Sequence, residues 1–192
     1  MSVSLVKEKV LYWAKLEVVK SQLLSKIIGI GVFIILTTLG AYIYLPLPFT
    51  PVPITLQTLF VLLSGAMLGP LEGFFSQLVY LVLGSLGFPV FSGARGGMLH
   101  LLGPTGGYLW GFLFSAWLVG KLIYGKKLNR FLLFFYFSLG IFVIYFFGLI
   151  QLKFFINKDL PTLISYGVLP FLLPDLLKVL VATWGYRFRR RN

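Results

Sequence analysis

An aspartate and a lysine stand three residues apart, as Asp175 and Lys178, in an otherwise apolar stretch from residue 167 to residue 184. The i,i+3 spacing puts both side chains on one helical face, where they can pair or share a ligand. Asp175 follows Pro174, which suits a first helical turn, where a carboxylate meets the positive end of the helix. An ion pair that only anchors the helix and a polar recognition site facing an outer pocket both agree with this pattern, and we favour the recognition site.

A second candidate is Arg95, which lies in the segment Ser92-Gly93-Ala94-Arg95-Gly96-Gly97. Glycines let the backbone approach a ligand closely, and successive backbone N–H groups can form a nest for an anion. A guanidinium adds a fork that suits a carboxylate. A solvated loop charge is the alternative. His100, a few residues on, is a weaker candidate because a lone histidine can simply cap a turn.

Three further residues are candidates for contact with a small ligand. Gln57 starts an apolar stretch and needs a hydrogen-bond partner there, from a ligand or from another helix. Tyr80 lies in the middle of the next apolar stretch, where packing is the commoner role. Phe91 flanks the glycine-rich segment and can line an apolar pocket, although aromatic residues also gather at membrane interfaces for other reasons.

Catalytic chemistry finds little support in the chain. It has no cysteine and one histidine, so thiolate nucleophiles and metal centres built from cysteines or several histidines are excluded. No Walker-type glycine loop is present, so the chain does not hydrolyse a nucleotide by that route. We therefore predict a protein that is not an enzyme, with no catalytic residue, metal or cofactor, whose energy comes from a gradient or a partner.

Composition decides the solvent. Hydrophobic residues make up 58% of the 192 positions and charged residues only 11%, against about 25% charged residues in soluble domains. Such a chain cannot coat a water-exposed surface, which leaves the lipid bilayer. The net charge of +12 lies mostly in short clusters between apolar stretches. That placement is typical of loops retained in the cytoplasm near anionic lipid, and it argues against nucleic acid as the partner.

The apolar stretches predict an all-α integral membrane protein with six spans. We place the spans at residues 23–44, 54–68, 71–86, 108–124, 132–155 and 167–184. With both termini inside, the cytoplasmic segments hold 13 of the 17 basic residues, as the positive-inside rule requires. The topology is therefore six helices, N-in and C-in.

The segments outside the spans have distinct compositions. Residues 1–21 mix lysines with apolar residues and predict a cytoplasmic interfacial leader, followed by a membrane domain over residues 22–192. Four prolines within residues 46–53 exclude a continuous helix there. Residues 87–107 hold seven glycines and two prolines and predict a long non-helical loop.

At this point the sequence resembles the BioY family, the biotin-specific S components of energy-coupling factor (ECF) transporters. Four motifs carry the resemblance in the family's order, from about residue 31 to residue 191: PLPFTPVPITLQT over residues 46–58, GFPVFSG over 87–93, GPTGGY over 103–108, and LPF over 169–171 with DLLK over 175–178. The chain departs from the family pattern at Pro174, where glycine is usual.

The resemblance implies a six-helix S-component fold that binds biotin from outside, and partners that are a transmembrane coupling subunit and two ATPase subunits. It assigns Arg95, Asp175 and Lys178 to the pocket, with Gln57 and Tyr80 as lesser candidates. We expect Asp175 to accept a ureido N–H, and Lys178 and Arg95 to serve the ureido carbonyl and the carboxylate in an order left open. The Pro-rich loop and Phe91 would supply apolar walls.

The sequence is compatible with three functions and leaves the docking surface for the coupling subunit undefined. The chain is compatible with a vitamin-capture subunit, with a stand-alone biotin transporter, and with an S component for a different small vitamin. S components tend to dock the coupling subunit through small residues on the first helix, since close helix approach favours them. Gly29 and Gly31 are the candidates in this chain.

Overall fold

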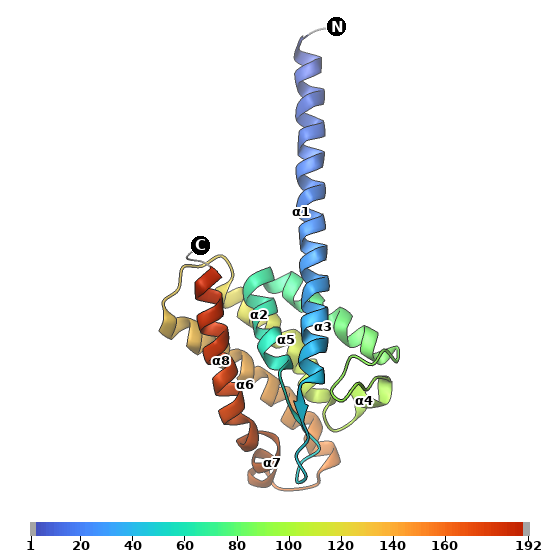
Figure 1. Cartoon of the computed structure of the whole chain (residues 1–192), viewed down its shortest axis with the longest axis vertical. Coiled ribbons are helices and arrows are strands. Elements are labelled where there is room, and N and C mark those ends of the chain that lie inside the picture. The colour runs from blue at the N-terminus through green and yellow to red at the C-terminus, as the bar shows by residue number, and fades with distance from the viewer. Residues whose placement is uncertain (1–2, 190–192) are drawn as a thin grey trace.

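The computed structural model describes the backbone of residues 3–189 and the side chains of residues 21–187. These residues form a helical bundle with one minimal hairpin (Figure 1). In chain order the elements are α1 (Val3–Tyr42), β1 (Tyr44–Leu45), β2 (Ile54–Thr55), α2 (Gln57–Leu68), α3 (Pro70–Ser85), α4 (Met98–Leu102), α5 (Gly106–Ile123), α6 (Arg130–Phe155), α7 (Leu160–Gly167) and α8 (Leu169–Arg189).

Helix α5 is the centre of the bundle and packs on α2, α3 and α6. Its glycines allow the close approach: a Cβ on Gly111 would lie 2.8 Å from the Cα of Ile144 on α6, and one on Gly120 would lie 2.6 Å from the backbone nitrogen of Pro70 on α3. Small residues at such crossings are what helix packing in a membrane requires, because lipid supplies no hydrophobic drive between helices. These close crossings hold α3 and α6 against α5.

Helix α1 is tied to its neighbours by polar contacts. The amide nitrogen Nε2 of buried Gln77 on α3 donates to Ser64 of α2 at 3.2 Å and lies 3.5 Å from the hydroxyl of Thr37 on α1. Lys26 of α1 pairs with Glu72 of α3 at 2.5 Å. These polar contacts join α1, α2 and α3 within largely apolar surroundings.

Four of these helices are long and apolar enough to cross a membrane: Ser21–Tyr42 of α1, Gly106–Ile123, Arg130–Phe155 and Leu169–Arg187 of α8. Helix α2 is apolar but has only 12 residues, which is about 18 Å at 1.5 Å per residue, against about 30 Å of hydrocarbon. The predicted helical membrane protein is confirmed, whereas six crossings and their orientation stay predictions.

The leader predicted over residues 1–21 lies almost entirely outside the described side chains. Its backbone from Val3 onward continues into α1 without a break, and a position on the membrane surface stays a prediction. In the same helix, a Cβ on Gly29 would lie 2.7 Å from a methyl of Leu68, whereas one on Gly31 would meet nothing within 4 Å. Gly29 and Gly31 therefore do not form one small-residue face, and of the two only Gly31 is open to a partner.

Two predictions of local structure were wrong, and one helix was not predicted. The glycine-rich segment 87–107 is not entirely non-helical, because α4 covers Met98–Leu102. The segment between the fifth and sixth predicted spans contains the unpredicted helix α7, with Asp159 as its N-cap and Pro161 in its first turn. Helix α8 starts at Leu169 and holds Pro174 in its interior, so Asp175 lies in its second turn and not its first. Pro170, directly after Leu169, is the proline that starts this helix.

The Pro-rich segment forms the loop of the β1–β2 hairpin. The two short strands pair antiparallel, with Tyr44 opposite Thr55 and Leu45 opposite Ile54. The start of α1 and the end of α8 point toward one end of the molecule, while this hairpin and α7 lie at the other (Figure 1). The hairpin leads directly into α2, so the first residues of α2 lie beside the loop that precedes them.

Candidate functional site

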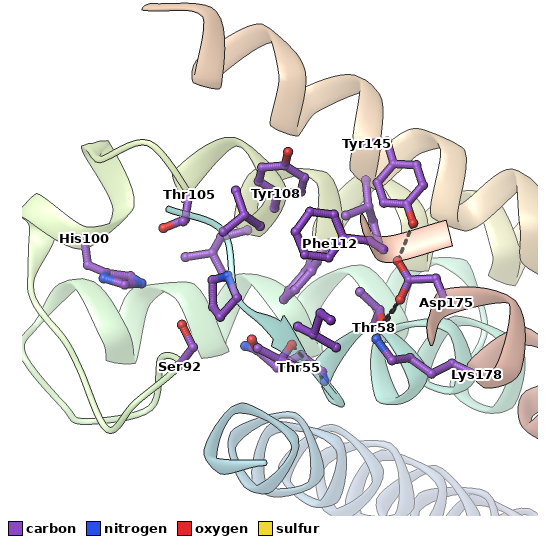
Figure 2. Close-up of a pocket in the computed structure, with 17 residues that line it drawn as sticks. Thr55, Thr58, Ser92, His100, Thr105, Tyr108, Phe112, Tyr145, Asp175 and Lys178 are labelled. Atoms are coloured by element: carbon purple, nitrogen blue, oxygen red, sulfur yellow. Dashed lines mark hydrogen bonds and ion pairs between the residues drawn. The ribbon is translucent and has the colours of Figure 1, made fainter. Parts of the chain in front are cut away.

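Four polar side chains from three helices form one buried network. Lys178 Nζ lies 2.6 Å from Asp175 Oδ1 on α8, and it also donates to the hydroxyl of Thr58 on α2 at 3.1 Å. Thr58 donates to Asp175 Oδ1 at 3.1 Å, and the Tyr145 hydroxyl of α6 donates to Asp175 Oδ2 at 2.6 Å. Figure 2 shows the side chains of Thr58, Tyr145, Asp175 and Lys178 converging on one another. The predicted Asp175–Lys178 pair is therefore real and is more than a self-contained pair.

The network leaves hydrogen-bonding capacity unused. Asp175 is 4% exposed and Lys178 is 9% exposed, so each charge needs the other and further hydrogen bonds to offset the loss of water. An ammonium has three protons, and those of Lys178 have two partners among the described residues, Asp175 and Thr58. A carboxylate can accept about four hydrogen bonds, and Asp175 accepts three. One donor and one acceptor are left for a ligand.

The network borders an elongated cavity with an empty volume of about 550 Å³. Its walls come from β2 and the loop before it, α2, α4, α5, α6 and α8. In Figure 2 Asp175 and Lys178 lie at one end of the lining, Ser92 and His100 lie at the other, and Phe112 lies between. Such a shape, apolar in the middle and polar at both ends, is typical of sites for small amphipathic molecules.

Arg95 borders a second cavity that adjoins the first. This outer cavity has an empty volume of about 810 Å³ and shares four lining residues with the inner one, namely Pro53, Ser92, His100 and Thr105. Arg95 is exposed. The structure thus brings Arg95 and the Asp175–Lys178 pair to two neighbouring hollows, although they are 80 or more residues apart in the chain.

His100 lines both the inner and the outer cavity. Partial burial, and then the nearby positive charge of Arg95, hold the pKa of His100 below its usual value of 6.5. His100 is therefore neutral at pH 7 and can donate or accept a hydrogen bond. The sequence alone supported this residue only weakly.

Gln57 lines the inner cavity, while Tyr80 and Phe91 line neither cavity. Tyr80 is fully buried behind Gln57, which donates to its hydroxyl at 2.5 Å. Phe91 is fully buried too: its ring meets Tyr80 edge-on at 5.6 Å between centroids and stacks on His100 at 5.1 Å. These two aromatic residues support the site from behind, and the apolar wall predicted for Phe91 comes from Phe112 and Phe171 instead.

Thr58 and Tyr145 were missed as site residues. Thr58 directly follows Gln57 in the first turn of α2, and its hydroxyl donates to Asp175 on α8. Tyr145 lies in the most continuously apolar helix of the chain, where a hydroxyl in mid-span requires a partner. That requirement is the signal that points to Tyr145, although it does not identify Asp175 as the partner.

Comparison with known proteins gives a consistent result. The model of the BioY family matches residues 12–191. A protein of Pyrococcus horikoshii named "Probable biotin transporter BioY" is 41% identical over 153 residues, which cover 80% of this chain and 88% of that protein. The "Biotin transporter BioY" of Thermotoga maritima is 39% identical over 160 residues, covering 83% and 92%.

A solved structure supports the same assignment. The crystal structure of an S-component for biotin from an ECF-type ABC transporter matches with a TM-score of 0.81 and 31% identity, over 90% of this chain and 94% of that one. The chain therefore shares the fold of that S component, which confirms the coarser part of the fold prediction.

Proposed function

Because the chain belongs to the BioY family, whose members are transporters and not enzymes, we propose that it is a substrate-binding S component that captures biotin on the outer side of a cell membrane. Import would then be driven by an ATP-hydrolysing energy-coupling module made of other chains. The observation that carries the proposal is the buried network of Thr58, Tyr145, Asp175 and Lys178 at one end of the elongated cavity.

The network matches the ureido ring of biotin. A cyclic urea offers two N–H donors and one carbonyl acceptor in a single plane. The remaining ammonium proton of Lys178 would bind the carbonyl, and Asp175 would accept one N–H, because each has capacity left after its internal hydrogen bonds. Both contacts are charge-assisted and therefore strong.

The rest of the ligand matches the rest of the hollow. The apolar thiophane ring and valeryl chain of biotin would lie along Phe112 and the hydrophobic wall, and the carboxylate would reach toward Arg95. We assign the carbonyl to Lys178 and the carboxylate to Arg95 because Lys178 shares its end of the cavity with Asp175, whereas Arg95 lines the outer cavity. Neutral His100 lies between the two cavities, where it can add a hydrogen bond to the carboxylate.

The proposed topology has six crossings with both termini in the cytoplasm. It is supported by the distribution of basic residues and by the start of α1 and the end of α8, which point to the same end of the molecule (Figure 1). The cavities would then open to the outside. The short helix α2 would cross together with the hairpin that precedes it, which is consistent with irregular backbone buried within protein at membrane depth.

Calorimetric titration of the detergent-purified chain with biotin is the direct test. We expect saturable binding at one site, with no comparable binding of other small vitamins. A titration in which biotin gives no heat while another vitamin binds would reject the proposed ligand. Biotin uptake in cells that lack every coupling-factor gene would instead reject the need for a coupling module and favour a stand-alone transporter.

A further inference from the structure

The hydrogen bonds behind Gln57 run in one direction. Gln57 Nε2 donates to the hydroxyl of Tyr80 at 2.5 Å, and that hydroxyl donates to the backbone carbonyl of Val90 at 2.9 Å. A phenol has one proton, so a hydroxyl that gives it to Val90 can only accept from Gln57. The side of the Gln57 amide that faces Tyr80 must therefore be the NH2 group.

The reverse orientation of the amide leaves a group unpaired. With Oε1 turned toward Tyr80, the hydroxyl could donate to Gln57 or to Val90 but not to both. The Val90 carbonyl has no other hydrogen-bond donor among the described residues. Val90 is partly buried, and loss of the Tyr80 donor to its carbonyl is unfavourable, so the relay from Val90 through Tyr80 favours one orientation of the Gln57 side chain.

The Tyr80 ring is itself held in place. Phe91 meets it edge-on and fills a notch over Gly84, where an added Cβ would overlap the Phe91 ring. The glycine-rich loop is also bound to α3 by the backbone N–H of Gly97, which donates to the Gly84 carbonyl at 2.7 Å. Tyr80 and Val90 therefore keep their relative positions, and the direction of the relay is built into the packing.

The outcome is a fixed acceptor at the cavity. Gln57 is 3% exposed and lines the inner cavity, and no described residue donates to its Oε1. We propose that the Val90–Tyr80–Gln57 relay makes Gln57 a specificity-determining residue, which accepts the second N–H of a cyclic urea while Asp175 accepts the first. Tyr80 is then a positioning residue. This inference rests on the proposed function and adds to it the reason why the cavity selects a urea.

A urea is distinguished from related rings by this arrangement. Asp175 and Gln57 offer two acceptors and Lys178 offers a donor, which complements two N–H groups and one carbonyl. A cyclic carbamate, in which oxygen replaces one N–H, would direct a lone pair at one of the two acceptors. Sites that hydrogen-bond a specific polar group reject analogues that lack it far more strongly than apolar pockets reject a changed methylene.

The test compares biotin with its two carbamate isomers, one with oxygen at each ureido nitrogen position. Affinities are measured by calorimetry or competition on the purified full-length chain, in wild type, Tyr80→Phe, Gln57→Met and Tyr42→Phe. Tyr42 is the matched control, because its hydroxyl donates to the adjacent carbonyl of Pro89 at 2.7 Å without contacting Gln57. The readout is the ratio of biotin affinity to carbamate affinity.

For the isomer whose ring oxygen faces Gln57, we expect that ratio to fall by about tenfold in Tyr80→Phe and in Gln57→Met. A tenfold change corresponds to the contribution of one hydrogen bond. The ratio should stay at the wild-type value in Tyr42→Phe, and the ratio for the other isomer, which faces Asp175, should not change in any variant. A wild-type ratio in Tyr80→Phe, or an equal fall in Tyr42→Phe, would overturn the relay. If Tyr80→Phe does not fold, a wild-type ratio in Gln57→Met overturns the contact. Failure of the wild type to bind biotin at all would reject the proposed function instead.

Discussion

The two ends of the hollow are built in different ways. At the inner end, Thr58, Tyr145, Asp175 and Lys178 project from α2, α6 and α8 and hold one another by hydrogen bonds. At the outer end, Arg95 and His100 lie on the segment between α3 and α5, where Gly87, Gly93, Ala94 and Gly97 all have positive φ. Among these four, Ala94 is the one that has a side chain and pays a steric cost there, with φ of 56°.

The inner end is suited to recognising the ligand, and the outer end to attracting it. Buried groups on rigid helices lose little conformational entropy when a ligand binds. They also discriminate strongly against other ligands, because an unpaired polar group in a buried site costs free energy. An exposed arginine on a loop acts through a screened charge, so it adds modest affinity and steers an anion toward the hollow. We therefore expect substitutions at the inner end to weaken biotin binding most, and substitutions at the outer end to weaken it less and to change ligand preference.

The largest effect is expected for Asp175→Asn. Asparagine removes the negative charge that accepts the ureido N–H and leaves Lys178 uncompensated. A hydrogen bond to a charged group contributes about 1.5–3 kcal/mol, so biotin affinity should fall about a hundredfold. Asp159→Asn, which changes an exposed carboxylate bonded to Thr162 at 2.7 Å, should bind like wild type. Equal affinity in Asp175→Asn and wild type would remove the inner end from the site.

Gly84→Ala should uncouple the two ends. The added methyl overlaps the ring of Phe91, so the loop must shift, and overpacking of this kind costs about 1–3 kcal/mol of folding free energy. Thermal unfolding in detergent should show a lower midpoint, and the preference for biotin over uncharged biotin amide should shrink as Arg95 moves. Gly31→Ala, where a Cβ meets nothing within 4 Å, is the control and should not lower stability. A Gly84→Ala protein with wild-type stability would show that the loop is not held by this notch.

Arg95→Ala should lower the affinity for biotin about tenfold, because it removes one exposed charge-assisted contact. Biotin amide, which has no carboxylate, should bind both proteins alike, and the difference for biotin should narrow as salt is raised. Lys158→Ala removes another exposed cation outside both cavities and is the matched control. A proportionate loss of amide affinity in Arg95→Ala would mean that Arg95 serves the loop and not the carboxylate.

The smallest effect is a pH dependence at His100. Its pKa in the folded chain lies below 6.5, so the unfolded chain binds more protons at mildly acidic pH, and stability falls as pH drops below 6.5 through the folded pKa. A bound carboxylate nearby opposes that loss, so biotin should stabilise the chain slightly more at pH 6 than at pH 7.5. His100→Gln should flatten both trends in thermal unfolding curves. Trends that persist in His100→Gln would assign them to another group.

Much of the fold could be predicted from the amino-acid composition and the lengths of the apolar runs. Long apolar runs, each with a single lysine near its end, predicted the helices near residues 108–124 and 132–155 to within about two residues, because in lipid only a helix satisfies every backbone group internally. The short helices could not be predicted in this way. Helices α4 and α7 have five and eight residues, too few for a periodic pattern, and their existence depends on packing against longer neighbours.

What the sequence by itself determined was the solvent, the main helices and the presence of a few ionic groups too costly to be accidental. Asp175 and Lys178 stood out because their i,i+3 spacing is local, and helix geometry alone places them together. Only the tertiary structure decided that Thr58 and Tyr145 complete their network, since those contacts join residues 117 and 30 positions from Asp175. The tertiary structure also places Tyr80 and Phe91 behind Gln57 and outside the cavity lining. The reason is physical: backbone periodicity sets which side chains share a face, whereas the identity of the group that faces them depends on how whole helices pack.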